Sequence, residues 1–111
     1  MRERIRPDLA LRDVAGMLRS FDYVAGSIRL DHPDRAAVTV REWVQAARGG
    51  FVDGYAATSG IDIDAYDTLL TALELDKAVY EAIYESRNRP TWVTIPLRAI
   101  ARLVERSATV A

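Results

Sequence analysis

The chain has 111 residues, half of them hydrophobic, which suits one folded domain with an apolar core and excludes a disordered tail. Its 16 acidic and 15 basic residues nearly cancel, so no net positive field draws it to nucleic acid or to a membrane surface. The lack of cysteine and the single histidine exclude a disulfide framework and the usual zinc sites. The sequence has no run of about 18 apolar residues, so we predict no membrane span. We expect a cytoplasmic protein without a signal peptide.

The first predicted helix follows residues 1–8, a segment that we expect to be flexible. Its apolar residues recur at steps of mostly three and four, which places them on one helical face. They are Leu11, Val14, Leu18, Phe21 and Ile28. The pair His32–Pro33 ends the pattern, because proline disfavours helix at the residue before it.

A second helix is predicted after Pro33, which suits a first helical turn. Its expected buried face consists of Trp43, Ala47, Phe51 and Tyr55, with Val40 and Val44 alongside. Gly49–Gly50 lies inside it, and each glycine costs a helix interior about 1 kcal/mol relative to alanine. We therefore expect a kink or a close helix contact at this pair. Ser59–Gly60 ends the helix.

Two further helices complete an all-α fold of four to five helices in a single domain, residues 1–111. Asp62 or Asp64 is expected to cap the third, which runs to about Asn88. The last begins near Pro96. The third helix is predicted from the helical spacing of Leu69, Leu70, Leu73, Val79, Tyr80, Ile83 and Tyr84. The last helix is expected to bury Leu97, Ile100, Leu103 and Val104.

An acid-rich stretch without any basic residue runs from Gly49 to Asp76. Its carboxylates could hold a metal or bind sugar hydroxyls, but aspartate is also expected at helix starts and on solvated faces. Asp62, Asp64 and Asp67 do not have the spacing of an EF-hand loop, which requires a glycine at its sixth position and a glutamate at its twelfth. We favour caps and a solvated face, and we expect no metal site.

A second polar group lies in ELDKAVYEAIYESRN, Glu74 to Asn88. On a helix, Asp76, Tyr80 and Tyr84 form one row at four-residue spacing. The next row consists of Lys77, Glu81, Glu85 and Asn88. Two tyrosines a turn apart beside polar groups suit a sugar, whose ring has an apolar face and whose edge carries hydroxyls. A second interpretation stays open, in which the tyrosines are core residues and the charged row is an exposed ion-pair ladder.

Three segments resemble maltokinases: LRDVAGMLRSFDY (Leu11 to Tyr23), REWVQAARGGFVDGY, and ELDKAVYEAIYESRNRPTWVTIPL (Glu74 to Leu97). Maltokinases use ATP and magnesium to phosphorylate the anomeric hydroxyl of maltose, giving maltose 1-phosphate for glycogen or α-glucan synthesis from trehalose. The resemblance implies a kinase-like fold, shared with aminoglycoside kinases, of which this chain would be the carboxy-terminal part of the helical lobe.

The resemblance also implies roles for individual residues. In maltokinases the catalytic aspartate and the metal-binding aspartate precede the segment that matches Leu11 to Tyr23. We therefore expect no catalytic residue and no ATP or magnesium site in this chain, and no turnover by the chain alone. The substrate-binding role carries over to Tyr80, Tyr84, Asp76, Glu81 and Arg87.

Two other functions stay open. The chain could be a non-catalytic helical module that binds trehalose synthase, to which maltokinases are sometimes fused or bound, or that binds the missing kinase portion. It could also be the lobe of a related sugar kinase with another substrate, such as glucosamine, because the helix pattern is shared more widely than the substrate.

Overall fold

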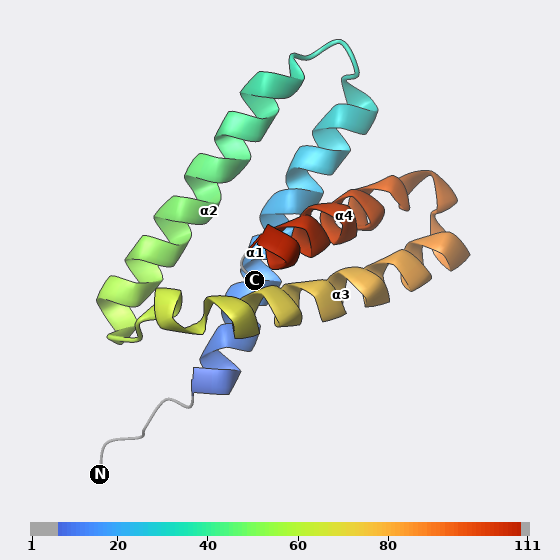
Figure 1. Cartoon of the computed structure of the whole chain (residues 1–111). Helices are drawn as coiled ribbons and strands as arrows, with labels where there is room; N and C mark the ends of the chain where they lie inside the picture. Colours follow the sequence, from blue (N-terminus) through green and yellow to red (C-terminus); the bar gives the residue numbers. More distant parts are fainter. Residues whose placement is uncertain (1–6, 110–111) are drawn as a thin grey trace.

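The computed structural model describes residues 7–109, and within them the chain is all-α with four helices, as predicted (Figure 1). The helices are α1 (Pro7–Asp31), α2 (Ala37–Ser59), α3 (Asp67–Asn88) and α4 (Thr94–Thr109). Short 3-10 turns, η1 (Ile63–Tyr66) and η2 (Pro90–Trp92), precede α3 and α4. None of these helices is both long and apolar enough to cross a bilayer.

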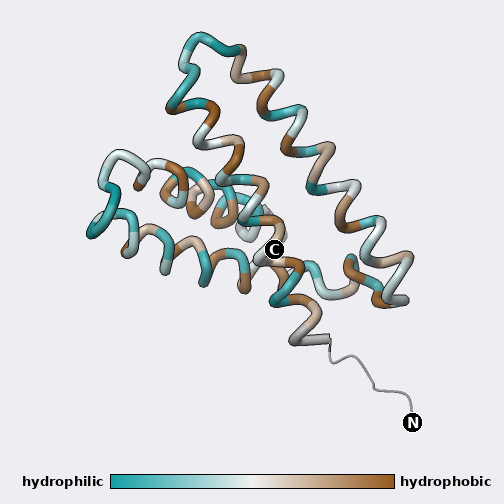
Figure 2. Tube along the Cα trace, turned by 180° about the vertical axis from the view of Figure 1, so that it is seen from behind, coloured by the Kyte–Doolittle hydropathy of each residue, from teal (hydrophilic) through white to brown (hydrophobic). Residues whose placement is uncertain are grey.

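Helix α1 is the central element of the bundle. Helix α2 runs antiparallel beside it, while α3 crosses it and α4 returns along α3, so that the chain forms two helical hairpins (Figure 1). Hydrophobic and hydrophilic residues alternate along every helix (Figure 2), which is the pattern of helices buried on one side only. Of the segment expected to be flexible, residues 1–6 lie outside the described part, and Pro7 and Asp8 belong to α1.

Apolar contacts on α1 hold the two hairpins together. The larger cluster of buried residues consists of Leu11, Val14, Ala15, Leu18, Ile63 and Leu70, and the smaller one of Ala25, Val40 and Val44. Burying each large side chain stabilises the fold by about 1.5–3 kcal/mol. The predicted apolar stripe of α1 is therefore confirmed.

The predicted buried face of α2 is only partly correct. Val40 and Val44 are buried, but Trp43 is 46% exposed and meets Phe21 edge to face, with 6.3 Å between ring centroids. The reason is that α2 packs chiefly on α1, so only a narrow stripe of α2 is covered. Helix α2 runs through Gly49–Gly50 without a visible kink, and open space surrounds both glycines, so the expectation of a kink or contact there is wrong (Figure 1).

The faces of α3 and α4 also differ from the prediction. In α3 the buried positions include Glu74 and Glu85, and the apolar Leu69, Val79 and Ile83 are exposed. In α4, Leu97 and Val104 are about half exposed, whereas Ile95, Pro96, Ala99 and Leu103 are buried. Glu74 and Glu85 lie inside because Arg48 of α2 and Arg89, directly after α3, pair with them, and this turns apolar residues of α3 outward.

The ends of the helices follow the predicted signals with small shifts. Asp62 caps η1 rather than α3, by accepting a hydrogen bond from the backbone amide of Ala65 at 3.3 Å. Helix α2 ends at Ser59, and Gly60 caps it with a positive φ of 75°, which favours glycine. Pro33 lies in the turn before α2 rather than in its first turn.

Helices α1 and α4 approach each other so closely at Gly26 that a side chain there would collide with Ile95. A Cβ atom at Gly26 would lie 2.5 Å from Cγ1 and 2.7 Å from Cδ1 of Ile95. We predict that Gly26→Ala lowers the free energy of unfolding by about 1–3 kcal/mol, because the contact must open. Urea unfolding measures the effect. Gly50→Ala is the matched control and should stabilise by up to about 1 kcal/mol, since nothing lies near that position. An equal gain at Gly26 would contradict the packing described.

Candidate functional site

A groove of about 630 Å³ lies between α1 and α3. Its α1 side is formed by Gly16, Arg19, Ser20 and Tyr23, and its α3 side by Asp76, Lys77, Tyr80 and Glu81. We call it the α1–α3 groove. Aromatic, hydroxyl, carboxylate and cationic groups meet in it, so it offers both an apolar surface and hydrogen-bonding groups to a polar ligand.

The structure brings together only some of the residues selected from sequence. Asp76, Tyr80 and Glu81 line the α1–α3 groove, whereas Tyr84 and Arg87 do not. Tyr80 is 72% exposed and Tyr84 is 48% exposed, so neither is a core residue of this bundle. The interpretation of the two tyrosines as core aromatics is therefore wrong for this chain.

Two residues that line the groove, Arg19 of α1 and Glu81 of α3, form an ion pair. The guanidinium group of buried Arg19 donates to Glu81 Oε1 from Nε at 2.9 Å and from Nη2 at 2.7 Å. Burial raises the pKa of Glu81 and outweighs the opposing effect of Arg19. Burial lowers the pKa of Arg19, but the hydrogen bond and the charge of Glu81, together with Asp22 and Glu74, raise it overall. Both side chains are held in place by this pair.

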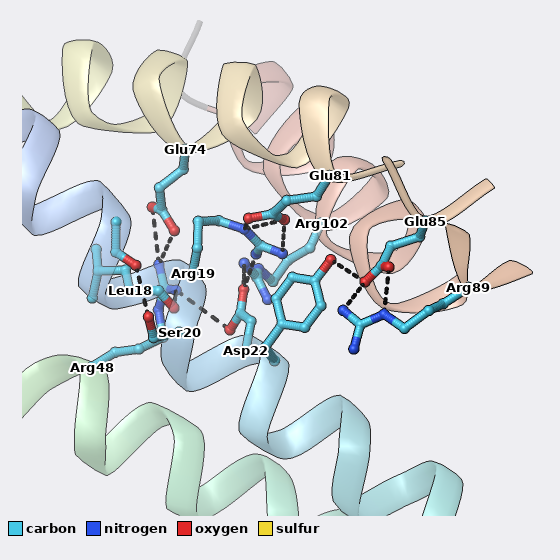
Figure 3. Close-up of polar contacts among 12 residues, drawn as sticks. Leu18, Arg19, Ser20, Asp22, Arg48, Glu74, Glu81, Glu85, Arg89 and Arg102 are labelled. Atoms are coloured by element: carbon cyan, nitrogen blue, oxygen red, sulfur yellow. Dashed lines mark hydrogen bonds and ion pairs between the residues drawn. The ribbon is translucent and has the colours of Figure 1, made fainter. Parts of the chain in front are cut away.

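The pair continues into a network that joins all four helices (Figure 3). Buried Asp22 accepts hydrogen bonds from Arg19, from Arg102 at 2.8 Å and from Arg48 at 3.5 Å. Arg48 also donates to both carboxylate oxygens of Glu74, at 2.8 and 3.0 Å. Each buried charge thus has a partner, which a charge in a low-dielectric interior requires.

A second polar group fixes the corner between α3 and α4. The fully buried carboxylate of Glu85 accepts from Tyr23 Oη at 2.9 Å and from Arg89 Nε and Nη2 at 2.9 and 2.8 Å (Figure 3). Arg89 lies over the ring of Trp92, 4.1 Å from its centroid, and Trp92 stacks on Tyr23. Tyr23 is therefore held at the edge of the α1–α3 groove from two sides.

The buried charges were missed from sequence although a signal for them exists. Asp22 lies four residues after Leu18 and three before Ala25, so it falls on the apolar stripe of α1. Glu74 falls likewise between Leu70 and Ala78 on α3. A charge on an apolar stripe indicates a buried ion pair, and the assignments of Glu74 to a solvated face and of Glu85 to an exposed ladder are wrong.

The acid-rich stretch gathers no metal site in the part of the chain that the structure describes, where no group of three or more histidine, cysteine, aspartate or glutamate residues could hold an ion. Glu74 is bound to Arg48, and Asp67 pairs with Arg106. Asp62 serves as a cap. Two of these carboxylates thus have arginine partners and a third has a structural role.

The contact between Tyr23 and Glu85 predicts a dependence of stability on alkaline pH. Burial, then the hydrogen bond to Glu85, raises the pKa of Tyr23 above its ordinary value of 10.0. Above that value the unfolded chain ionises this phenol while the folded chain keeps it protonated, so the free energy of unfolding falls as pH rises. We predict that Tyr23→Phe flattens this fall between about pH 9 and about pH 11.

Urea unfolding at the two pH values measures the slope, and Tyr66→Phe is the control because it removes a more exposed phenol at η1. Tyr23→Phe also removes a hydrogen bond worth about 1 kcal/mol at either pH, so the slope and not the absolute stability is the readout. An unchanged slope in Tyr23→Phe would contradict the assignment.

Comparison with known proteins relates the chain to sugar kinases. No family model matches it. It is 38% identical over 90 residues to the glucosamine kinase of Streptacidiphilus jiangxiensis, and 30% identical over 111 residues to the glucosamine kinase of Mycolicibacterium smegmatis. These alignments cover 78% and 96% of this chain, but only 20% and 27% of the two kinases. The chain thus has partial similarity to glucosamine kinases, and its narrower resemblance to maltokinases stays a prediction.

Proposed function

We propose that this chain is the part of a sugar kinase, related to glucosamine kinase, that supplies one wall of the sugar site. The observation that carries the proposal is the α1–α3 groove, in which Asp76, Tyr80 and Glu81 meet Tyr23 and Ser20 from another helix. The similarity to two glucosamine kinases supports it independently.

The groove has the chemistry that a pyranose needs. The exposed ring of Tyr80 can cover the apolar face of the sugar, while the hydroxyl groups of Ser20 and Tyr23 and the carboxylate of Asp76 can bind its hydroxyls. Ser20 Oγ donates to the backbone oxygen of Gly16 at 3.1 Å and can still accept a hydrogen bond. Glu81 is committed to Arg19, so its role is to position the wall.

An amino sugar fits this groove better than a neutral one. Asp76 is exposed in the groove and has no ion pair among the described residues, so its carboxylate is available to the ammonium group of glucosamine. Lys77 lies toward α1, with its Nζ 4.0 Å from the position of a Cβ on Gly16. Maltose, which carries no charge, would gain nothing from Asp76 beyond a hydrogen bond.

Phosphoryl transfer itself requires ATP, magnesium and an aspartate near the acceptor hydroxyl. The chain spans only about a fifth to a quarter of the kinases that it resembles. We propose that the other parts of such a kinase hold the nucleotide and the metal, and that this chain alone does not turn over MgATP. Its contribution is to orient the sugar against the phosphate donor.

We predict that the chain can replace the matching segment of the Streptacidiphilus jiangxiensis glucosamine kinase. The chimera should release ADP from MgATP in the presence of glucosamine, because the grafted segment carries its own groove and buried ion pairs. Release of ADP with glucosamine, maltose and glucose is compared in a coupled assay. A folded chimera that uses none of these sugars would overturn the proposal. A chimera that uses maltose alone would show that the substrate is maltose and not glucosamine.

In the same chimera, we predict that Asp76→Asn raises the KM for glucosamine about tenfold, because the hydrogen bond to the ammonium group loses the negative charge of its acceptor. Tyr80→Ala should weaken binding of glucosamine and of glucose alike, since the ring packs on the sugar face rather than on the amino group. Asp64→Asn and Tyr66→Ala are the matched controls, on exposed residues outside the groove. Equal effects of the site and control variants would contradict the assigned roles.

Maltose is the second candidate, supported by the resemblance of Glu74 to Leu97 to maltokinases. A non-catalytic module that binds trehalose synthase or a kinase portion is a third, and exposed apolar side chains such as Trp43, Leu69 and Ile83 could contact such a partner. Co-purification of the chain with trehalose synthase, without any sugar binding, would favour this third function.

A further inference from the structure

A second cavity, of about 460 Å³, lies between α2 and α4 with α1 as its floor. Its lining contains six arginines and a single carboxylate, that of Asp22. The arginines are Arg29, Arg41, Arg48, Arg98, Arg102 and Arg106. We call this space the arginine cavity. The formal net charge of the chain is −1, so positive charge is concentrated here although the molecule as a whole carries almost none.

Helical spacing directs these side chains into one space. Arg41, Gln45 and Arg48 recur at steps of four and three on α2, and Arg98, Arg102 and Arg106 recur at steps of four on α4. Residues at these steps share one face of a helix. Because α2 and α4 have little backbone contact with each other, the two faces stay apart and enclose a space over α1.

Only some of the six guanidinium groups are neutralised by carboxylates. Arg48 and Arg102 pair with Asp22, Arg48 also pairs with Glu74, and Arg106 pairs with Asp67. Among the described residues, no ion pair joins a carboxylate to Arg29, Arg41 or Arg98. Within residues 7–109, these three cations therefore line one cavity without an ion-pair partner.

Two of these arginines, Arg41 and Arg98, act on the third, Arg29. Burial, then the charges of Arg98 and Arg41, lowers the pKa of Arg29, whereas Asp22 opposes the change. The group stays charged at neutral pH, because arginine titrates far above it. The free protein therefore contains electrostatic repulsion that an anion in the cavity would relieve.

We propose that the arginine cavity binds a phosphate group through Arg29, Arg41 and Arg98. Guanidinium groups bind phosphate oxygens through paired, charge-assisted hydrogen bonds, and a doubly charged phosphate matches several cations better than chloride does. Buried Ala25, Val44 and Ala99 form apolar parts of the wall, which limits the water that competes for the anion. The phosphate is either inorganic or carried by a small molecule such as a sugar phosphate or a nucleotide.

This site is separate from the α1–α3 groove. The two share no lining residue, and the groove opens between α1 and α3 whereas the cavity opens between α2 and α4. The proposal does not rest on the proposed function, because phosphate binding is measured without sugar and without turnover.

The 111-residue chain is titrated with inorganic phosphate at constant ionic strength held with sodium chloride, and amide shifts and the thermal midpoint are recorded. We expect saturable shifts confined to residues around the cavity and a rise in the thermal midpoint with phosphate, since a ligand of the folded state stabilises it. Separate titrations use a sugar monophosphate and ADP. Tighter binding of one of these identifies a phosphate carried by a small molecule, and equal binding identifies inorganic phosphate.

Arg41→Gln and Arg98→Gln remove exposed side chains that have no carboxylate partner in the described part of the chain, so neither is expected to impair folding. Each should weaken phosphate binding about tenfold. Arg12→Gln is the matched control, because Arg12 is exposed on α1 outside the cavity, and it should leave the affinity unchanged. The proposal is overturned if phosphate gives no saturable response beyond that of chloride, or if Arg12→Gln weakens binding as much as the cavity variants do.

Discussion

The arrangement of this bundle depends on one buried carboxylate, that of Asp22. It accepts hydrogen bonds from arginines on α1, α2 and α4, and through Arg19 and Arg48 it is connected to the glutamates of α3. Apolar contacts between amphipathic helices allow several relative rotations at similar free energy, but a charge without a partner in the interior costs several kcal/mol. The network therefore selects the rotation of α3 in which Glu74 and Glu81 face the arginines of α1 and α2.

The dependence of α3 on this network explains which features of the fold could be predicted from the sequence. The all-α fold, the number of helices and most of their ends could be predicted, because proline, glycine and apolar spacing act locally. The face of α1 was also correct, since its stripe is buried from several sides. The face of α3 was not, because the inward position of Glu74 and Glu85 depends on Arg48 and Arg89 in distant or later segments. Of the five residues selected for a sugar site, only Asp76, Tyr80 and Glu81 share a groove, since helical spacing alone cannot show which residues of α3 face α1.

The same dependence gives the candidate sugar site its rigidity. Tyr23 and Glu81 are both held by partners from other elements, whereas Tyr80 and Asp76 are exposed in the α1–α3 groove. Tyr23 and Glu81 can therefore be preorganised for a ligand, while Tyr80 and Asp76 can still adjust to it.

Asp22 also connects the α1–α3 groove with the arginine cavity. Through Arg19 it supports the wall of the α1–α3 groove, and through Arg48 and Arg102 it borders the arginine cavity. An anion that drew Arg102 away from Asp22 would leave more of that negative charge to Arg19, and so would change the competition between Asp22 and Glu81 for the same guanidinium group. Occupancy of one site would then alter the affinity of the other, and thermodynamic linkage requires the effect to be equal in both directions.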